Sequence, residues 1–524
     1  MTEAVEWRAQ PRWCVLETGF GPATHFLATW RAWRDDPQRP ALLHYVAVAA
    51  VPCSADAIRH HAANRPLLKE LADALADGWW GLEPGTQRIS LEGGRVLLTL
   101  LVGESVLLLR GLGRFADSVR IGPGMPTADL ARAVARCCRR GARLVAGEAL
   151  PALREALTAA GFEVSSTEPD QCARLVHLPA RHQDPVPRVA GDAVVVGAGL
   201  AGAAVARALA LRGWTVTVRE AGPGPAAGAS GVPAGLFAPH VSADDAVLSR
   251  ISRAGVRALR GAAESLLQRG VDWELSGVVQ FQEGEAPLWH PYAGWLRPAR
   301  LVQALLATPG ITVRYGDRVQ TAGPGVLTVI ATGFEAGDLL GEGLALQPVA
   351  GQVSFGAAEG APATPHPWNG HGHFLPSIPD EAGARVWLAG ASFERDMSAL
   401  TVAPQALTRH RADNQQRLRE LLPSLAPTLG ARFDHAQDWR GVRGTSPDRL
   451  PIVGPWPPGG DDSVWACTAL GARGITTAVL CADLLVARLH HEPLPIAPRL
   501  AEALCTERIL RRLQKPSKQA ADSS

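Results

Sequence analysis

Apolar positions in the first third of the chain form short runs separated by helically spaced patterns. The runs have the length and composition of buried strands, and the patterns between them repeat every three to four residues. Strands that alternate with helices predict a parallel, doubly wound α/β sheet. The expected strands are Trp13–Leu16, Leu43–Val48, Arg95–Leu101 and Ala142–Ala146, and the expected helices are Ala55–His61, Pro66–Ala76 and Leu130–Arg139.

A Pro-rich stretch without periodicity separates this domain from a second α/β domain. In the middle of the second domain, roughly 270–400, apolar and polar residues alternate, as in Val278–Phe281 and Arg385–Gly390. This pattern predicts an antiparallel sheet inserted into the fold. The expected organisation is a first domain at 1–180, a linker at 181–191, a second domain at 192–500 and a basic tail at 501–524.

Composition narrows the class of protein. Hydrophobic residues make up 47% of the chain and charged residues 19%, which is typical of a soluble globular protein. No stretch resembles a signal peptide or a membrane span, so we expect a cytoplasmic protein without a membrane partner. The eight cysteines include no C-x-x-C pair, so we expect reduced thiols and no metal site.

A glycine motif opens the second domain. The strand Ala193–Val196 leads into Gly197-x-Gly199-x-x-Gly202, a helical pattern follows, and the next strand ends at Glu220. In such a motif the first glycine permits the tight turn, the second lets the backbone approach a pyrophosphate, and the third lets helix and strand pack closely. The helix N-terminus attracts phosphates, and Glu220 is placed to bind a ribose hydroxyl. The order of these parts predicts a dinucleotide site.

Three later segments of small residues are candidates for contact with the same cofactor. One is the loop after the second strand, one ends a buried strand at Val326–Ala331, and one opens an apolar helix that runs through Leu485. The N-terminus of that helix would stabilise negative charge on a reduced flavin ring. The candidate cofactor-binding residues in these segments are Ser230, Gly231, Ala331, Gly333, Gly471, Arg473, Gly474 and Ile475.

Two arginines in the block Trp439–Gly454 are candidates for binding an acidic substrate. Arg440 and Arg443 lie in a predicted strand, and a guanidinium can hold a carboxylate with two hydrogen bonds. The alternative for each arginine is an ion pair at a sheet edge. Pro451–Gly454 is expected to turn the chain back toward the cofactor.

Together these segments resemble the FAD-dependent amine oxidases of the glycine oxidase and D-amino acid oxidase type. The resemblance covers roughly 190–500 and includes a Pro348–Gln352 segment that is expected to form a turn. It implies FAD as cofactor and removal of a hydride from the carbon beside an amine. It also implies that Arg443, as a catalytic residue, binds the carboxylate of the substrate.

The first domain extends the resemblance over nearly the whole chain. Glu17, Gly19 and Gly21 follow a strand and resemble the S-adenosylmethionine loop of class I methyltransferases. A methyltransferase-like domain followed by an amine oxidase domain resembles the bifunctional tRNA 5-methylaminomethyl-2-thiouridine biosynthesis family (MnmC). The segments that resemble this family include Gly19–Trp30, Gly228–Gly231, Gly294–Pro298, Val349–Val353 and Gly441–Arg443.

That resemblance implies a tRNA partner. The FAD half would remove the carboxymethyl group from 5-carboxymethylaminomethyl(-2-thio)uridine at the wobble position and leave the aminomethyl form. The methyltransferase half would then add a methyl group to the exposed amine.

The methyltransferase half departs from its family at several points together. Pro22 and Ala23 interrupt the glycine-rich loop, and Ala49 and Ala50 stand where an acid for the ribose belongs. The stretch from Asp117 lacks the family's catalytic Asp and Asn, and the family's leader before the first strand has no counterpart. We therefore expect a degenerate domain that keeps its fold, has lost most or all methyl transfer, and has no functional S-adenosylmethionine site.

Three alternatives remain open at this point. The protein could be fully bifunctional, it could oxidise free glycine or sarcosine, or it could bind RNA with FAD as a structural component only. The composition gives no support for an RNA-binding surface, because the basic residues are scattered along the chain. The basic tail Arg508–Lys518 is expected to be a solvated helix end. His240 and His373 could face a substrate, but structural or surface roles are the expectation for both.

Overall fold

The computed structural model forms two compact units. The first unit comprises 1–190, 211–213 and 486–501, and the second comprises 191–210, 214–485 and 502–524. The predicted domain boundaries stay predictions. The structure describes residues 7–122, 127–146, 150–165, 172–176, 184, 186–321, 325–360, 364–395, 404–460 and 462–513.

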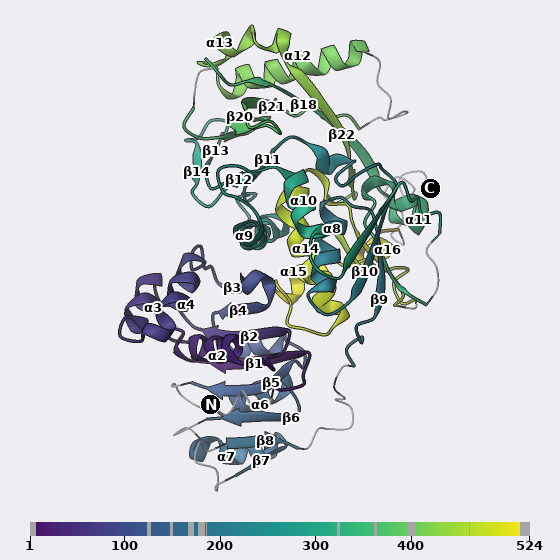
Figure 1. The fold of residues 1–524 in the computed structure, drawn as a ribbon. Helices are drawn as coiled ribbons and strands as arrows, with labels where there is room; N and C mark the ends of the chain where they lie inside the picture. Colours follow the sequence, from purple (N-terminus) through teal and green to yellow (C-terminus); the bar gives the residue numbers. More distant parts are fainter. Residues whose placement is uncertain are drawn as a thin grey trace, which may run out of the picture. The chain divides into compact units, whose positions relative to one another are not determined.

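The first unit is built on an eight-stranded sheet, and its central strands are parallel (Figure 1). In spatial order the strands are β3 (Gly85–Leu91), β4 (Val96–Val102), β2 (Leu42–Ala49), β1 (Arg12–Thr18), β5 (Ala116–Ile121), β6 (Cys138–Val145), β8 (Cys172–Leu175) and β7 (Phe162–Val164). Strands β3 and β8 run antiparallel to the parallel core.

Helices cover both faces of this sheet, so the predicted doubly wound arrangement is confirmed. One apolar core contains Phe26, Ile58 and Leu71, and the other contains Val134 and Leu153. The helices on the first side are α2 (Thr24–Asp35), α3 (Ala55–Ala62) and α4 (Pro66–Asp77). Those on the second side are α5 (Ser105–Arg110), α6 (Ala128–Cys137) and α7 (Leu150–Ala159).

Helix α6 has the same length as the predicted helix Leu130–Arg139 but begins and ends two residues earlier, at Ala128 and Cys137. It begins after the Thr127 hydroxyl, which accepts a hydrogen bond from the Leu130 N–H at 3.1 Å. It ends at Cys137 because Cys138 pairs with Ala116 of β5 and begins strand β6. The neighbouring strand edge therefore overrides the helical pattern of the last residues.

A buried ionic cluster ties the C-terminal segment 486–501 into the first unit. Arg212 donates to the Glu492 carboxylate at 2.6 and 2.9 Å, and both side chains are almost fully buried. Arg12 lies 3.7 Å from the same carboxylate and donates to the His490 carbonyl at 2.7 Å. Arg88 donates to the Pro493 carbonyl at 2.5 Å. The first unit is thus assembled from residues at both ends of the chain.

The buried His490 makes the stability of the first unit depend on pH. Burial lowers the pKa of its imidazole from 6.5 to about 4, with Arg212 and Arg12 lowering it further and Glu492 opposing them. The unfolded chain takes up a proton below pH 6.5, whereas the folded chain does so only near pH 4. The contribution of His490 to the free energy of unfolding is therefore fully present above pH 6.5. It is expected to fall by about 3 kcal/mol as the pH drops to 4.

Urea unfolding at several pH values measures this effect. The His490→Gln variant, which keeps a hydrogen-bond donor but cannot titrate, is expected to lose less stability than the parent over the same range. An equal loss in both proteins would show that His490 does not carry the dependence.

The second unit contains a six-stranded sheet that is parallel except for β23. Its strands in spatial order are β16 (Ile311–Tyr315), β10 (Thr215–Glu220), β9 (Asp192–Val196), β17 (Leu327–Ile330), β24 (Val464–Thr468) and β23 (Ile452–Pro455). The helices α8 (Leu200–Ala210), α9 (Val247–Leu266), α10 (Pro298–Leu306), α11 (Ala336–Leu340), α14 (Gly474–Leu489) and α16 (Glu507–Leu513) also appear in Figure 1. Helix α15 (Pro498–Glu502) lies almost wholly in the segment 486–501 of the first unit. The carboxyl ends of β9, β10 and β17 meet at one edge, where ligands bind in sheets of this kind.

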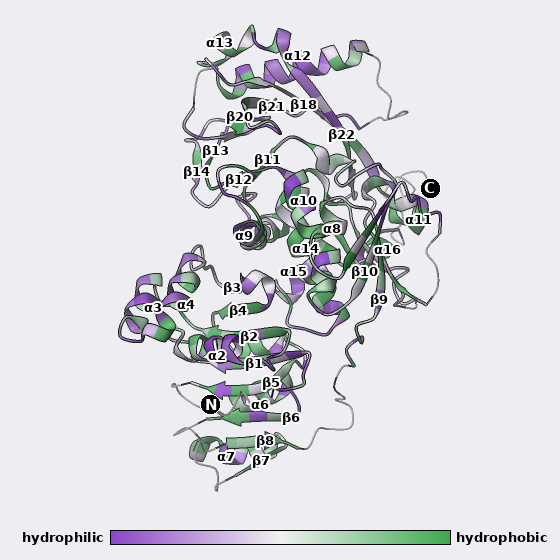
Figure 2. Ribbon diagram, in the orientation of Figure 1, coloured by the Kyte–Doolittle hydropathy of each residue, from purple (hydrophilic) through white to green (hydrophobic). Residues whose placement is uncertain are grey.

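A seven-stranded, largely antiparallel sheet forms the other layer of the second unit, as predicted. Its strands in order are β14 (Leu288–His290), β13 (Val278–Gln280), β19 (Trp368–Asn369), β20 (His373–Pro379), β21 (Arg385–Gly390), β18 (Gln347–Ala357) and β22 (Gln437–Thr445). Apolar residues of α12 (Pro404–Leu421) and α13 (Ala426–Gly430) pack on it, although Figure 2 shows hydrophilic residues along most of α12. A small sheet of β11 (Gly235–Phe237), β15 (Gly294–Leu296) and β12 (Trp273–Glu274) completes the unit.

Two segments that the sequence predicts as turns are strands in the structure. Pro348–Gln352 lies inside β18, which pairs with β22 from Gln347 opposite Thr445 to Phe355 opposite Gln437. Pro451–Gly454 runs into β23, which pairs with β24. Proline and glycine suggested turns in both segments, but pairing with a neighbouring strand keeps the chain extended.

Candidate cofactor and substrate site

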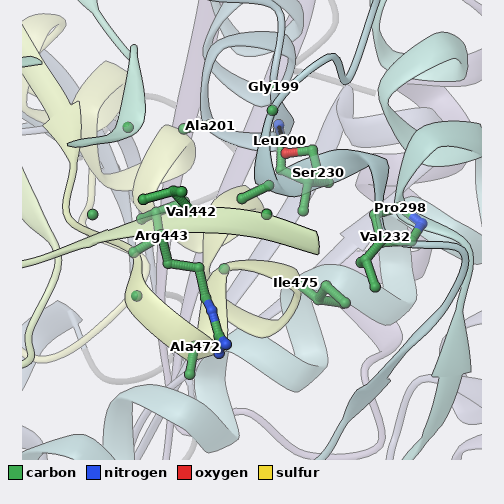
Figure 3. Close-up of a pocket in the computed structure, with 18 of the residues that line it drawn as sticks. Gly199, Leu200, Ala201, Ser230, Val232, Pro298, Val442, Arg443, Ala472 and Ile475 are labelled. Atoms are coloured by element: carbon green, nitrogen blue, oxygen red, sulfur yellow. Dashed lines mark hydrogen bonds between the residues drawn. The ribbon is translucent and has the colours of Figure 1, made fainter. Parts of the chain in front are cut away.

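A cavity of about 1160 Å³ lies in the second unit. Its wall brings together the β9–α8 turn, the ends of β10 and β17, the strand β22 and the N-terminal turn of α14. Figure 3 shows Gly199, Ser230, Arg443 and Ile475 on this wall. The volume exceeds that of most pockets for small ligands, so the cavity has room for an elongated cofactor together with a substrate.

Two of the three glycines of the motif, Gly197 and Gly202, occupy positions that exclude a side chain. Gly197 has φ +106°, and a Cβ there would lie 2.7 Å from the Ala331 carbonyl oxygen. A Cβ on Gly202 would lie 1.8 Å from the Gly197 carbonyl oxygen, so this glycine allows α8 to approach the turn. Gly199 lines the cavity, where its bare backbone is open to a ligand. The residues therefore suit a dinucleotide at the helix N-terminus.

Ser230 supports the first turn of α8. Its hydroxyl accepts a hydrogen bond from the Leu200 N–H at 2.9 Å and lies within 3.1 Å of where a Gly199 Cβ would be. The neighbouring Gly231 does not line the cavity, but a Cβ there would lie 2.7 Å from the Ala226 carbonyl oxygen. Ser230 thus holds the loop 228–231 against the motif, and Gly231 lets this loop approach Ala226 closely.

Glu220 lies at the end of β10 and lines the cavity. Its carboxylate accepts hydrogen bonds from the Ala198 N–H at 2.6 Å and from the Gly222 N–H at 2.7 Å. Carboxylate oxygens have further lone pairs, so Glu220 can still accept from a ribose hydroxyl. The same side chain therefore fixes the glycine turn and presents an acceptor to the cofactor.

The remaining predicted cofactor residues also line the cavity. Ala331 and Gly333 follow β17, and the Gly333 carbonyl accepts from the Thr468 hydroxyl at 2.7 Å. Gly471, Arg473, Gly474 and Ile475 form the turn that opens α14. Burial lowers the pKa of the Arg473 guanidinium. Two helix N-termini, of α8 and α14, thus face one cavity and favour a ligand that carries negative charge at both places.

The structure separates the two candidate arginines of β22. Arg440 forms an ion pair with Glu394, with its Nη2 3.1 Å from Oε2, and this pair lowers the pKa of Glu394. Arg443 has no ion pair among the residues that the structure describes. Figure 3 shows its side chain extended from the strand, and burial lowers the pKa of its guanidinium. Of these two arginines, Arg443 is therefore the one whose guanidinium is not already paired with a carboxylate of the described residues.

Gly351 makes room for the Arg443 side chain. It lies in β18, two residues along from Val349, which pairs with Arg443. A Cβ on Gly351 would lie 1.9 Å from Arg443 Nη2. The long β18–β22 ladder thus both positions the arginine and leaves space for it.

The predicted methyltransferase loop lies in the first unit, after β1. Glu17 is buried and accepts a hydrogen bond from the Tyr45 hydroxyl at 2.9 Å, while Gly19 has φ +75°. A Cβ on Gly21 would have no atom within 4 Å, so the structure leaves room for a side chain there. Part of the segment expected to lack the catalytic residues, 123–126, lies outside the described residues.

Sequence reasoning missed several residues of the cavity wall. Phe393 and His371 line the cavity and have no motif around them that could have drawn attention. His373, which the sequence named as a possible substrate contact but for which a structural or surface role was expected, also lines the cavity, and burial together with Arg443 lowers its pKa to about 4. Gly370 and Gly372, which flank His371, were the one available sign. His240, in contrast, bonds to Ser249 at 2.9 Å.

Other expectations from the sequence can be compared with the described residues. All eight cysteines are free, and seven of them are buried. Within the described ranges, no helix is long and apolar enough to cross a membrane, and no group of three His, Cys, Asp or Glu could hold a metal ion. Arg508 is not a solvated tail residue, because it pairs with Asp448 at 3.0 Å. Residues 514–524 of the tail lie outside the described residues.

Comparison with known proteins agrees with this geometry. The family model "FAD dependent oxidoreductase" (DAO) matches 192–289 and 283–488. The tRNA 5-methylaminomethyl-2-thiouridine biosynthesis bifunctional protein MnmC of Paracidovorax citrulli is 41% identical, over 96% of this chain and 93% of its own. The protein of the same name from Verminephrobacter eiseniae is 40% identical, over 96% and 97%.

Among solved structures, glycine oxidase from Geobacillus kaustophilus matches 59% of this chain and 97% of its own, with 18% identity and a TM-score of 0.48. A likeness at this distance says nothing about substrate or mechanism. The sequence relatives and the family model are much closer. The chain belongs to the family of bifunctional tRNA 5-methylaminomethyl-2-thiouridine biosynthesis proteins, and its second unit is an FAD-dependent oxidoreductase.

Proposed function

We propose that this protein oxidises the carboxymethylaminomethyl group of wobble uridine in tRNA, with or without the 2-thio group, and leaves an aminomethyl group. The names of the two relatives connect those proteins to this modification. The main support for the proposal is the position of Arg443. This cation lies in the cavity that contains the dinucleotide motif, and it has no ion-pair partner among the described residues. The proposal implies a tRNA partner and a cytoplasmic location.

The substrate arm contains a secondary amine and a carboxylate separated by one methylene. Arg443 binds the carboxylate with two hydrogen bonds and fixes the methylene in the cavity. FAD, held by the glycine motif and Glu220, supplies the hydride acceptor for that methylene. His373 stays neutral at physiological pH, so it adds no second cation that would compete for the carboxylate.

The bonds broken and formed account for both products. Loss of a hydride from the methylene and a proton from the amine gives a carbon–nitrogen double bond. Water then adds to that carbon, and the carbon–nitrogen bond breaks. The nitrogen stays on the uridine as a primary amine, and the two-carbon fragment leaves as an aldehyde that carries the carboxylate.

Deleting the gene tests the proposal in cells. Wobble uridines from the deletion strain, analysed by mass spectrometry, are expected to accumulate the carboxymethylaminomethyl form. The result that counts against the proposal is an unchanged nucleoside profile together with loss of free glycine oxidation, because it would favour a free amino acid oxidase.

We also propose that the first unit is a methyltransferase-like domain without a functional S-adenosylmethionine site. The loop after β1 is tied down, because the Phe20 N–H donates to the Val48 carbonyl and the Gly122 N–H donates to the Thr18 carbonyl. Phe20 is buried and stacks on Trp79 with ring centroids 6.0 Å apart. These contacts fill the loop region with the chain's own side chains, which supports the loss of the cofactor.

Isothermal titration of the full-length protein with S-adenosylmethionine is expected to show no binding at concentrations where the family's active domains would saturate. FAD content measured on the same sample controls for folding. Stoichiometric binding, or transfer of a labelled methyl group to aminomethyl-uridine tRNA, would restore the fully bifunctional alternative.

A further inference from the structure

Phe393 is a large apolar side chain that remains exposed at the wall of the catalytic cavity. It follows strand β21, and 52% of its surface is accessible. Its ring centroid lies 4.9 Å from Cζ of Arg443 and 5.9 Å from Cζ of Arg417. Exposure of an aromatic ring beside a substrate-binding arginine suggests that the ring contacts the substrate.

The backbone on both sides of Phe393 is fixed. The Ser392 N–H donates to the Gln352 carbonyl at 3.1 Å, and the Glu394 N–H and carbonyl both bond to Ala350 at 3.0 Å. The Glu394 side chain pairs with Arg440, and His410 Nε2 lies 2.8 Å from it. An exposed ring on such a rigid segment loses little conformational entropy when a flat ligand binds to it.

The apolar cores of the second unit do not account for this side chain. The clusters around β20, β21 and α12, and around β18 and β21, are formed by other residues of the described chain. Two arginines, Arg417 and Arg443, make cation–π contacts with the Phe393 ring. The position of the ring therefore has a reason other than packing.

We propose that Phe393 is the stacking platform for the pyrimidine ring of the wobble nucleotide. This inference rests on the proposed function and specifies how the base is recognised. Proteins that act on unpaired bases commonly stack them on aromatic rings. Only a methylene, an amine and a second methylene separate the pyrimidine from the carboxylate. Since Phe393 and Arg443 are direct neighbours, one ligand can reach both.

Arginine charges around the ring suit a nucleotide rather than a free amino acid. Arg417 is fixed by a hydrogen bond from its Nη1 to the His371 carbonyl at 2.8 Å. Arg395, two residues after Phe393, is exposed, and Arg409 acts electrostatically on the adjacent Glu394. Positive charges near a stacked base attract the phosphates on either side of it. A free amino acid would use neither the platform nor these charges.

The test compares Phe393→Leu with Phe393→Tyr. Leucine keeps an apolar cover over Arg443 but has no aromatic face, whereas tyrosine keeps the face. The substrates are an anticodon hairpin with the carboxymethylaminomethyl uridine and, as a ligand with amine and carboxylate but no base, N-methylglycine. KM for the hairpin is measured by nucleoside analysis, and binding of N-methylglycine by the change in flavin absorbance.

The leucine variant is expected to raise KM for the hairpin roughly 5- to 100-fold, the range that loss of one base–aromatic stack produces. The tyrosine variant should restore the parent value, and binding of N-methylglycine should change less than about 2-fold in both, within the error of such mutational comparisons. Parent-like hairpin kinetics in the leucine variant, or an equal loss for both ligands, would overturn the platform. No turnover of the hairpin by the parent protein would instead overturn the proposed function.

Discussion

Replacement of Arg443 by glutamine is expected to raise KM for the modified tRNA by at least about 30-fold. Truncating one partner of a buried, hydrogen-bonded charge pair costs about 2–5 kcal/mol, and each 1.4 kcal/mol is a factor of ten. Arg443 is the β22 arginine without an ion-pair partner among the described residues, so the carboxylate would lose its cation. Lysine at this position keeps the charge but not the paired donors, and an intermediate loss is expected.

Arg411→Gln is the matched control for this prediction. Arg411 packs against the same sheet but pairs with Asp438 at 2.6 Å and is absent from the cavity wall. Its loss should lower stability and leave KM near the parent value. Arg443→Gln with normal FAD content and an unchanged KM would remove Arg443 from the proposed mechanism.

Replacement of Gly202 by alanine is expected to abolish stable FAD binding. The new Cβ would lie 1.8 Å from the Gly197 carbonyl oxygen, which is backbone and cannot rotate away. Helix α8 would have to move off the turn, and its N-terminus would leave the position that binds the pyrophosphate. Overpacking of this kind costs about 1–3 kcal/mol or more, so the melting temperature should fall as well.

Gly337→Ala provides the control in another helix of the same unit. Nothing lies within 4 Å of a Cβ at Gly337, and alanine is the better helix former. This variant should keep its FAD and its melting temperature. If Gly202→Ala retained FAD as well as Gly337→Ala does, the close packing of α8 on the glycine turn would not matter for the cofactor.

The parallel sheets and the glycine motif could be predicted because their determinants are local. Buried strands such as β1 and β9 are continuous apolar runs, and the turn at Gly197 needs glycines at fixed spacing. The candidate cofactor residues came from such local patterns, and most of them line one cavity in the structure. Their contact with FAD stays a prediction.

Features that depend on pairing between distant segments could not be predicted. The β18–β22 ladder makes a strand of Pro348–Gln352, and the same ladder decides that Arg440 reaches Glu394 while Arg443 remains available. Phe393 stands out only once its exposure and its neighbours are known. The position of 486–501 in the first unit depends on the buried ion pair between Glu492 and Arg212. The sequence around Glu492 does not indicate that its partner is Arg212.

The most direct test of the proposed function uses the purified, FAD-loaded protein with tRNA that carries carboxymethylaminomethyl uridine at the wobble position. Digestion and mass spectrometry after incubation in air quantify each nucleoside, with and without S-adenosylmethionine. The carboxymethylaminomethyl form should disappear and the aminomethyl form should appear in equal amount under both conditions. Persistence of the starting nucleoside would contradict the oxidase, and appearance of methylaminomethyl uridine with S-adenosylmethionine would contradict the inactive first unit.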